Sequence, residues 1–361
     1  MNYLRKLVSI KSDENGDEII NYLFEYFQGK VEDIKIIKNQ ENEHKSILIG
    51  FNTKLKNCSP IVLSGHLDTV IPNYELYNTD PFILTEIDGK NYGLGSIDMK
   101  SFMAIIMENV EQLKEKTEPI IGCFTTDEET EFICIRNVVE EMKKLNIYPK
   151  FTIVGEPTSS HIHIVSKGFL CCQIKFYGKA CHSSIPQNGI NSIYALAKFV
   201  SFIEENQKKY TDLTSNAGVV SGGEIVNKVP DYAVLTIDIR SNYKDEIDRF
   251  FSEIENKAIQ IEHEYNGIKI VIEKFLFIPP LQNQNNEKIN EIAKCLNIEI
   301  GEFSGGCEGG YYTKYSGDAV IFGVGDLSLA HKPNEYVKNE DFDRYPSLLF
   351  ELIEKINYYY K

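Results

Sequence analysis

Short apolar runs of strand length alternate with helical patterns in the first part of the chain. Nearly continuous apolar runs predict strands at 46–51, 60–64, 120–126 and 151–156. Apolar residues at helical spacing predict helices over 102–113 and 135–145. Buried strands separated by helices are typical of an α/β sheet that helices cover on both faces.

The pattern changes near residue 166 and returns near residue 279. Strands are predicted at 169–177, 219–223, 234–240 and 269–275, and helices at 191–210 and 244–265. This strand-helix-strand-strand-helix-strand order is typical of a ferredoxin-like domain. The α/β pattern then resumes with a helix at 287–296, a strand at 319–323 and a helix from Asp341. We therefore predict a discontinuous α/β domain, 1–166 and 279–361, with a mixed, mostly parallel sheet, and an inserted α+β domain, 167–278.

Composition narrows the classes of function. The formal net charge of −15 argues against nucleic-acid binding and is compatible with a small cationic substrate. The eight cysteines include no CxxC pair, which indicates reduced thiols in a reducing compartment. No window approaches ~18 apolar residues, so we expect neither a signal peptide nor a membrane span, and a cytoplasmic location.

Residues of the types that bind metals follow three of the predicted strands. His66, the pair Glu128 and Glu129, and Glu156 each come directly after a buried apolar run. In open α/β sheets, ligands bind beyond the carboxyl ends of the strands. Asp98 and His331 add further candidates from loops. Two imidazoles and three carboxylates suit a pair of divalent ions, with zinc expected and cobalt or manganese as alternatives.

Each segment also has an ordinary interpretation. His66 and Asp68 form an HxD pair, which is compatible with a surface histidine beside a turn, or with a carboxylate that orients a metal-binding imidazole. Asp98 precedes an expected helix and could simply cap it. The acidic run 127–131 could be a solvated helix start, where negative charge is favourable.

The joint pattern resembles one known family. The matching segments are SGHLDTV, DPFILTEIDGKNYGLGSIDMKS, TTDEET, VGEPTS, GKACHSSIPQNGINSI and AHKPNEYV. They resemble the di-zinc amidohydrolases and exopeptidases that include acetylornithine deacetylase, succinyl-diaminopimelate desuccinylase, aminoacylases and glutamate-type carboxypeptidases. The acetylornithine deacetylase branch is the most similar, and the resemblance runs from about residue 60 to about residue 340.

The resemblance implies a role for each ligand-type residue. Asp98 would bridge two zinc ions, and the peptide bond after it is expected to be cis. His66 and Glu156 would complete one site, and Glu129 and His331 the other. Two further residues would act beside the metals, Glu128 as general base and Asp68 as the residue that orients His66.

The inserted domain would supply further residues and the surface of a homodimer. By the same resemblance, His182 would reach the active site of the partner subunit and stabilise the oxyanion. Arg240 would hold a substrate carboxylate and Asn227 would bind substrate. On the residues alone, His182 could be a loop histidine and Arg240 a charge at the end of a strand.

The glycine-rich segment 303–310 departs from the deacetylase branch, because its Ser-Gly-Gly start resembles the desuccinylases. Glu308 is a candidate for recognising a substrate ammonium, and the alternative is a tight loop. We predict hydrolysis of N-acetylornithine to ornithine and acetate, a step of arginine biosynthesis. The alternatives are a succinyl-diaminopimelate desuccinylase, an N-acetylcitrulline deacetylase, a dipeptidase, or a non-catalytic binding protein that metal stabilises.

Overall fold

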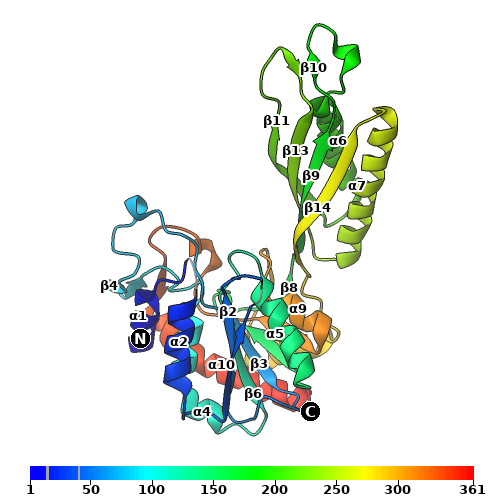
Figure 1. Cartoon of the computed structure of the whole chain (residues 1–361). Helices are drawn as coiled ribbons and strands as arrows, with labels where there is room; N and C mark the ends of the chain where they lie inside the picture. The colour runs from blue at the N-terminus through cyan, green and yellow to red at the C-terminus, as the bar shows by residue number, and fades with distance from the viewer. Residues whose placement is uncertain (14–15, 40) are drawn as a thin grey trace. The chain divides into compact units, whose positions relative to one another are not determined.

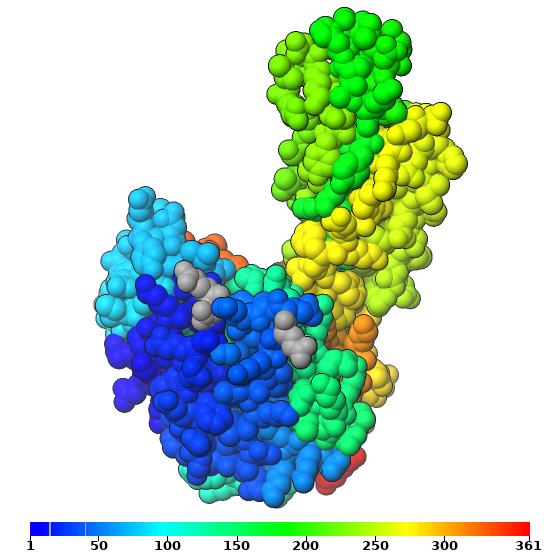
Figure 2. Space-filling view, viewed as in Figure 1, coloured from blue at the N-terminus to red at the C-terminus, as the bar shows by residue number. Residues whose placement is uncertain are grey.

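The computed structural model describes residues 1–13, 16–39 and 41–361. The chain forms two compact units, one built from Met1–Ser166 and Leu281–Lys361, and the other from Lys167–Pro280. The second unit is a single stretch of chain, coloured green to yellow in Figure 2, and the first is interrupted by it. Each unit has a hydrophobic core of its own.

An eight-stranded sheet forms the centre of the first unit, in the order β1-β2-β6-β3-β7-β16-β8-β15. The strands are β1 (Asp33–Lys38), β2 (Lys45–Gly50), β3 (Ile61–His66), β6 (Ile120–Thr125), β7 (Phe151–Val154), β8 (Ile162–Ser166), β15 (Ile300–Phe303) and β16 (Asp318–Ile321). The four central strands, β6, β3, β7 and β16, run parallel to one another. Their carboxyl ends therefore meet at one edge of the sheet.

Helices cover both faces of this sheet (Figure 1). They are α1 (Asn2–Ser9), α2 (Asp17–Phe27), α3 (Lys100–Glu108), α4 (Val110–Lys114), α5 (Ile133–Lys144), α8 (Asn286–Leu296), α9 (Gly309–Tyr315) and α10 (Asn339–Tyr359). Val320 of β16 packs into the main core with α1, α2, α3, α8 and α10, whereas Ala319 and Ile321 face Cys307 and Leu281 on the other side. Because successive residues of a strand point to opposite faces, a strand covered on both sides must be apolar throughout.

A three-stranded sheet stands apart from the large one. Its order is β17-β5-β4, and its strands are β4 (Thr85–Ile87), β5 (Lys90–Tyr92) and β17 (Tyr336–Lys338). The pairing joins two segments that lie far apart in the sequence, with Tyr336 opposite Tyr92 and Lys338 opposite Lys90. Short 3-10 turns, η1 (Tyr74–Leu76) and η4 (Leu327–Leu329), complete this unit.

The second unit is a four-stranded antiparallel sheet with two long helices. Its strands are β9 (Gly168–Tyr177), β11 (Thr214–Gly222), β13 (Tyr232–Ser241) and β14 (Lys269–Ile278), in the order β11-β13-β9-β14. The helices are α6 (Ser192–Asn206) and α7 (Lys244–Glu264), and smaller elements are β10 (Cys181–His182), β12 (Lys228–Val229), η2 (Pro186–Asn188) and η3 (Gln207–Lys209). Every second residue of β9 and β13 is buried, because both helices pack on one face of the sheet.

The predicted α/β fold with its inserted ferredoxin-like part is confirmed. The strand-helix-strand-strand-helix-strand order and the sheet order of the second unit are both those of a ferredoxin-like fold. Sequence patterns missed the helices α1, α2 and α9 and the small sheet of β4, β5 and β17. They also missed β1, β8 and β15, which lie at or near the edges of the large sheet. Within the described residues, no helix is long and apolar enough to cross a membrane.

Candidate metal centre

The ends of three central strands deliver ligand-type side chains to one place. His66 is the last residue of β3, and Glu156 follows β7 by two residues. Glu128 and Glu129 lie in a turn three and four residues after β6. Asp98 comes two residues before α3, and His331 two residues after η4, so these two arrive from loops.

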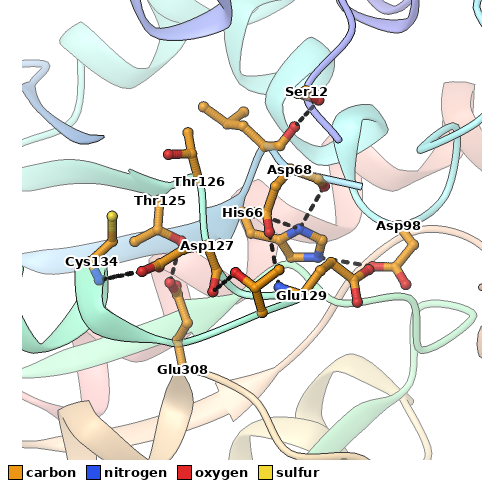
Figure 3. A network of polar contacts seen from close by, with 12 residues as sticks. Ser12, His66, Asp68, Asp98, Thr125, Thr126, Asp127, Glu129, Cys134 and Glu308 are labelled. Carbon is orange, nitrogen blue, oxygen red and sulfur yellow. Dashed lines mark hydrogen bonds and ion pairs between the residues drawn. The ribbon is translucent and has the colours of Figure 1, made fainter. Parts of the chain in front are cut away.

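Asp98 stands between two imidazoles. Its Oδ1 is 3.0 Å from Nε2 of His66, and its Oδ2 is 3.4 Å from Nε2 of His331. Glu156 approaches the same Nε2 of His66, with an oxygen 3.8 Å away. Glu129 lies beside His331, with Oε1 2.8 Å from Nε2. The five predicted ligands thus form one continuous cluster, part of which Figure 3 shows.

The hydrogen bonding of His66 shows that this cluster fits a metal. Nδ1 of the ring lies 3.0 Å from the carbonyl oxygen of Asp68, so Nδ1–H donates there and Nε2 carries the lone pair in the neutral ring. In the neutral ring that lone pair faces the Asp98 carboxylate, so Nε2 must carry either a proton, which it then donates to Asp98, or a metal ion. Candidate ligand sets are His66, Glu128 and Glu156 on one side and His66, Asp98 and Glu129 on the other. The donors are all nitrogen and oxygen, as zinc accepts.

Protons take up part of the excess negative charge in the cluster. Burial raises the pKa of Glu128 well above its usual range and that of Glu156 to about 7. Hydrogen bonds to Asp98 and Glu129 raise the pKa of His331 to about 10. Burial alone would lower the pKa of His66, but the carboxylate neighbours outweigh it and raise that pKa. A metal ion that binds here must displace these protons, so metal binding at this cluster should release protons and depend on pH.

The two ends of the cluster differ in burial. The His66 side chain is 1% exposed and that of Glu156 6%, whereas the His331 side chain is 55% exposed. Asp98, between them, is 8% exposed. Water and substrate can therefore approach from the His331 side.

Two glycines allow α3 to pack directly against the ligand-bearing strand ends. A Cβ on Gly155, the residue before Glu156, would lie 2.2 Å from Cγ of Phe102. A Cβ on Gly65, the residue before His66, would lie 2.3 Å from Cε of Met99. The absence of a side chain at these positions brings the start of α3, and with it Asp98, close to both strands.

A buried aspartate holds the turn that carries Glu128 and Glu129. The Asp127 carbonyl accepts from the amides of residues 130, 131 and 132, and its carboxylate accepts from Ile133 and Cys134 at the start of α5. Asp127 is 1% exposed, and the acidic run lies in a turn before α5, which begins at Ile133, so the run is not a helix start. The two glutamates lie in a turn and not on extended backbone.

The alternative interpretation of Asp98 as a helix cap is wrong. Met99 occupies the N-cap position of α3, and no side chain caps that helix. The peptide bond between Asp98 and Met99 is cis, as the resemblance implies.

The comparisons with known proteins decide the family. The model of peptidase family M20/M25/M40 matches residues 62–355, a span that contains all five of these side chains. The chain belongs to this family. It is therefore a hydrolytic enzyme that acts on amide bonds.

Curated relatives in this M20 family carry one name. An acetylornithine deacetylase of Buchnera aphidicola subsp. Acyrthosiphon pisum (strain APS) is 28% identical over 96% of this chain and 93% of its own. An acetylornithine deacetylase of Pasteurella multocida (strain Pm70) is 29% identical over 81% of this chain and 79% of its own. The predicted family is confirmed.

Solved structures share the fold. A tripeptidase of Staphylococcus aureus subsp. aureus Mu50 has a TM-score of 0.77 at 23% identity, over 98% of this chain and 96% of its own. A dinuclear metal-binding peptidase of the M20 family from Bacillus subtilis has a TM-score of 0.69 at 17% identity, over 97% of this chain and 95% of its own.

Asp68 contacts His66 in this M20 chain mainly through its backbone. The carbonyl oxygen is 3.0 Å from Nδ1 and carboxylate Oδ1 is 3.5 Å away. The other carboxylate oxygen, Oδ2, accepts from the amide of Glu129 at 2.9 Å. Asp68 therefore joins the end of β3 to the turn after β6.

The structure corrects the prediction for Glu308. Its side chain is buried, 1% exposed, and accepts a hydrogen bond from Ser64 on β3. It accepts a second from Thr125 on β6 (Figure 3). Burial raises the pKa of Glu308 to about 8. Because both oxygens are engaged by strand hydroxyls, Glu308 does not present a free carboxylate to a substrate ammonium. The sequence pattern could not show this, since a charged residue in a glycine-rich segment is usually exposed.

The three predicted residues of the inserted part all lie in the second unit. His182 is exposed, with Nδ1 2.7 Å from the Ser184 hydroxyl. Asn227 is a neighbour, since its carbonyl accepts from the amide of Ser183. Arg240 already holds a carboxylate, because Nε and Nη2 donate to Asp238. The roles predicted for these three residues stay predictions.

Proposed function

We propose that the chain hydrolyses the amide bond of an N-acyl amino acid with two divalent ions, and that its substrate is N-acetylornithine. The main support for the two metal ions is that each oxygen of Asp98 faces a different imidazole nitrogen. A carboxylate in that position can bridge two ions roughly 3.5–4 Å apart. His66 and Glu156 would complete one site, and Glu129 and His331 the other, with zinc as the ion that these donors suit.

The protein side chains then provide positioning and proton transfer. Two ions held there would supply Lewis acidity, lowering the pKa of a water toward ~7 and polarising the acyl oxygen. Glu128 lies in the same ligand cluster as His66 and Glu156. It would accept a proton from the attacking water and deliver it to the leaving amine. Burial raises its pKa above that of a free glutamate, which makes it a stronger proton acceptor when ionised.

The choice of N-acetylornithine rests on the relatives and on charge. Curated relatives at 28% and 29% identity are named acetylornithine deacetylase. The net charge of −15 is compatible with a substrate that carries a free ammonium. Glu308 does not recognise that ammonium in this proposal, because it is buried against two strands.

A homodimer through the second unit is part of the proposal. The edge strand β11 exposes Val219 and Val220, which are 59% and 55% exposed, and Val226 beyond it is 98% exposed. Exposed apolar residues on an unpaired edge favour association with another copy. Sedimentation velocity of the wild type against Val219→Lys tests this part, and a wild-type monomer would contradict it.

A panel of substrates tests the proposed reaction. The zinc-loaded protein is assayed with N-acetylornithine, N-acetylcitrulline, N-succinyl-diaminopimelate and an unblocked dipeptide. We expect the highest kcat/KM for N-acetylornithine, with release of acetate and ornithine. A preference for the succinyl substrate, or a requirement for a free α-amino group, would replace the proposal by a desuccinylase or a dipeptidase. Metal binding without any turnover would favour a binding protein.

A further inference from the structure

Glu335 is a buried carboxylate to which the proposed mechanism gives no role. It immediately precedes β17 and is 2% exposed. Its Oε1 accepts from the amides of Ile97, at 2.7 Å, and Asp98, at 3.2 Å. Its Oε2 accepts from the amide of Gly95 at 3.0 Å. One side chain thus binds three backbone N–H groups of the loop that carries the central carboxylate.

This loop depends on outside partners for its shape. Residues 93–99 belong to no strand or helix, and Gly95 has a left-handed φ of +74°. Buried backbone N–H groups need acceptors. In a sheet, the carbonyl groups of a neighbouring strand are the acceptors, and in this loop the Glu335 carboxylate takes their place. The backbone at Asp98 is therefore placed by the side chain of Glu335.

Glu335 also belongs to the segment that carries the other loop ligand. His331 precedes it by four residues, and both His331 and Asn334 have left-handed φ values, +57° and +64°. Residues with a Cβ rarely adopt this conformation, so the segment must be held by contacts elsewhere. Asn334 accepts from the amide of Asn78 at 2.7 Å, and the carbonyl of Glu335 accepts from Gly93 at 3.0 Å.

The two loops are therefore joined through one residue. The Glu335 backbone joins its segment to Gly93, and its side chain joins it to residues 95–98. β17 and β5 extend the connection through their ladder. A displacement of the 331–335 segment would carry the Asp98 loop with it.

We propose that Glu335 is a positioning residue that couples the Asp98 loop to the His331 segment and so places Asp98 and His331 for metal binding. This inference rests on the proposed two-metal function. It places Glu335 outside the ligand set, acting through Asp98 and His331. Residues that orient metal ligands typically contribute 10–100-fold to metal affinity. The ion at the Glu129–His331 end should depend on Glu335 most, because both loops contribute to it.

Zinc titration of the metal-free full-length protein against a competing chelator tests the inference. The variants are Glu335→Ala, which removes all three acceptor contacts, and Glu335→Gln. An amide retains the acceptor for Ile97 and Asp98 but turns an NH₂ group toward the amide of Gly95. Glu340→Gln is the matched control, since Glu340 is a 78% exposed acid five residues away. Circular dichroism and thermal melting of the metal-free proteins report the fold separately.

The expected result is two zinc ions on wild type and on Glu340→Gln with equal affinities. Glu335→Ala should bind the weaker ion about 10–100-fold less tightly than the wild type. The affinity of Glu335→Gln for this ion should lie between those of the wild type and Glu335→Ala. Wild-type affinity for both ions in folded Glu335→Ala would overturn the inference. If that variant does not fold, Glu335→Gln decides: a weakened second ion supports the coupling and wild-type affinity refutes it. A wild type that binds fewer than two ions would instead overturn the proposed function itself.

Discussion

The two ends of the ligand cluster are built in different ways. At one end, His66 and Glu156 follow central parallel strands and are almost fully buried. At the other, Glu129 and His331 come from a turn and a loop, and the His331 side chain is 55% exposed. Asp98 lies between the two ends, and its loop is held by the side chain of Glu335.

This difference separates two ways of placing a ligand. Strand register positions the buried end, because neighbouring parallel strands present their last residues at the same edge. At the His331 end, buried acids position the chain by accepting hydrogen bonds from backbone amides, Asp127 in the turn that carries Glu129 and Glu335 in the Asp98 loop. The buried end should therefore tolerate little change in packing, whereas the exposed end should respond mainly through metal binding and turnover.

The largest expected effect is a loss of turnover on changing Glu128. This residue lies with the buried ligands and is proposed to act as the general base. Glu128→Gln removes the proton acceptor and keeps nearly the same shape. We expect kcat to fall by about 10²–10⁴-fold while both ions remain bound. Steady-state kinetics and metal analysis of the same preparation measure the two quantities. Full turnover in this variant would show that Glu128 is not the base.

Removing each imidazole compares the two ends directly. In the metal-free protein, His66→Ala leaves buried carboxylates without their partner, and we expect a loss of about 3 kcal/mol in the free energy of unfolding. His331→Ala, at the exposed end, should cost about 0–1 kcal/mol. Denaturant unfolding of both variants measures the difference. Equal losses would contradict the contrast between the two ends.

A packing change at the buried end should have a smaller effect. Gly155→Ala places a methyl group 2.2 Å from Cγ of the Phe102 ring, which is fully buried among its neighbours. We expect a loss of about 1–3 kcal/mol. Gly65→Ala is the matched comparison, because it meets the flexible end of Met99 and should cost less. Thermal melts of the metal-free proteins measure both losses. A larger loss for Gly65→Ala than for Gly155→Ala would show that Phe102 repacks around the new methyl group.

The last expected effect is a pH dependence of the free energy of unfolding that comes from Glu308, and it is the smallest of these effects when taken per pH unit. Burial raises the pKa of Glu308 to about 8. Between an unfolded pKa of about 4.3 and this value, the folded state holds a proton that the unfolded state has lost. Stability should therefore fall as pH rises through this window, by roughly 1 kcal/mol between pH 6 and pH 7 from this group.

Glu308→Gln separates this contribution from those of the other buried acids. An amide cannot ionise but can still accept from Ser64 or Thr125. The free energy of unfolding of the wild type, relative to that of the variant, should fall as pH rises. A difference that is constant from pH 5 to pH 8 would show that Glu308 does not titrate in this window.

Local pattern was sufficient for the strands and helices that matter most to the site. The apolar runs before His66, Glu128 and Glu156 predicted β3, β6 and β7, because a strand buried on both faces must be apolar along its length. The motif set also predicted all five members of the ligand cluster. The strands at the edges of the sheet were not predicted, because they are only partly buried and their sequences resemble those of loops.

The sequence by itself determined which donor residues come together at the strand ends, because donor types and the apolar runs before them are local properties of the chain. Only the tertiary structure decided where Glu308 and Glu335 belong. Both are acids in polar segments, which pattern assigns to the surface. Each instead lies buried among hydrogen-bond donors that are more than 180 residues away in sequence. No local pattern encodes such a distant partner, so the function of a buried acid becomes apparent only once the chain has folded around it.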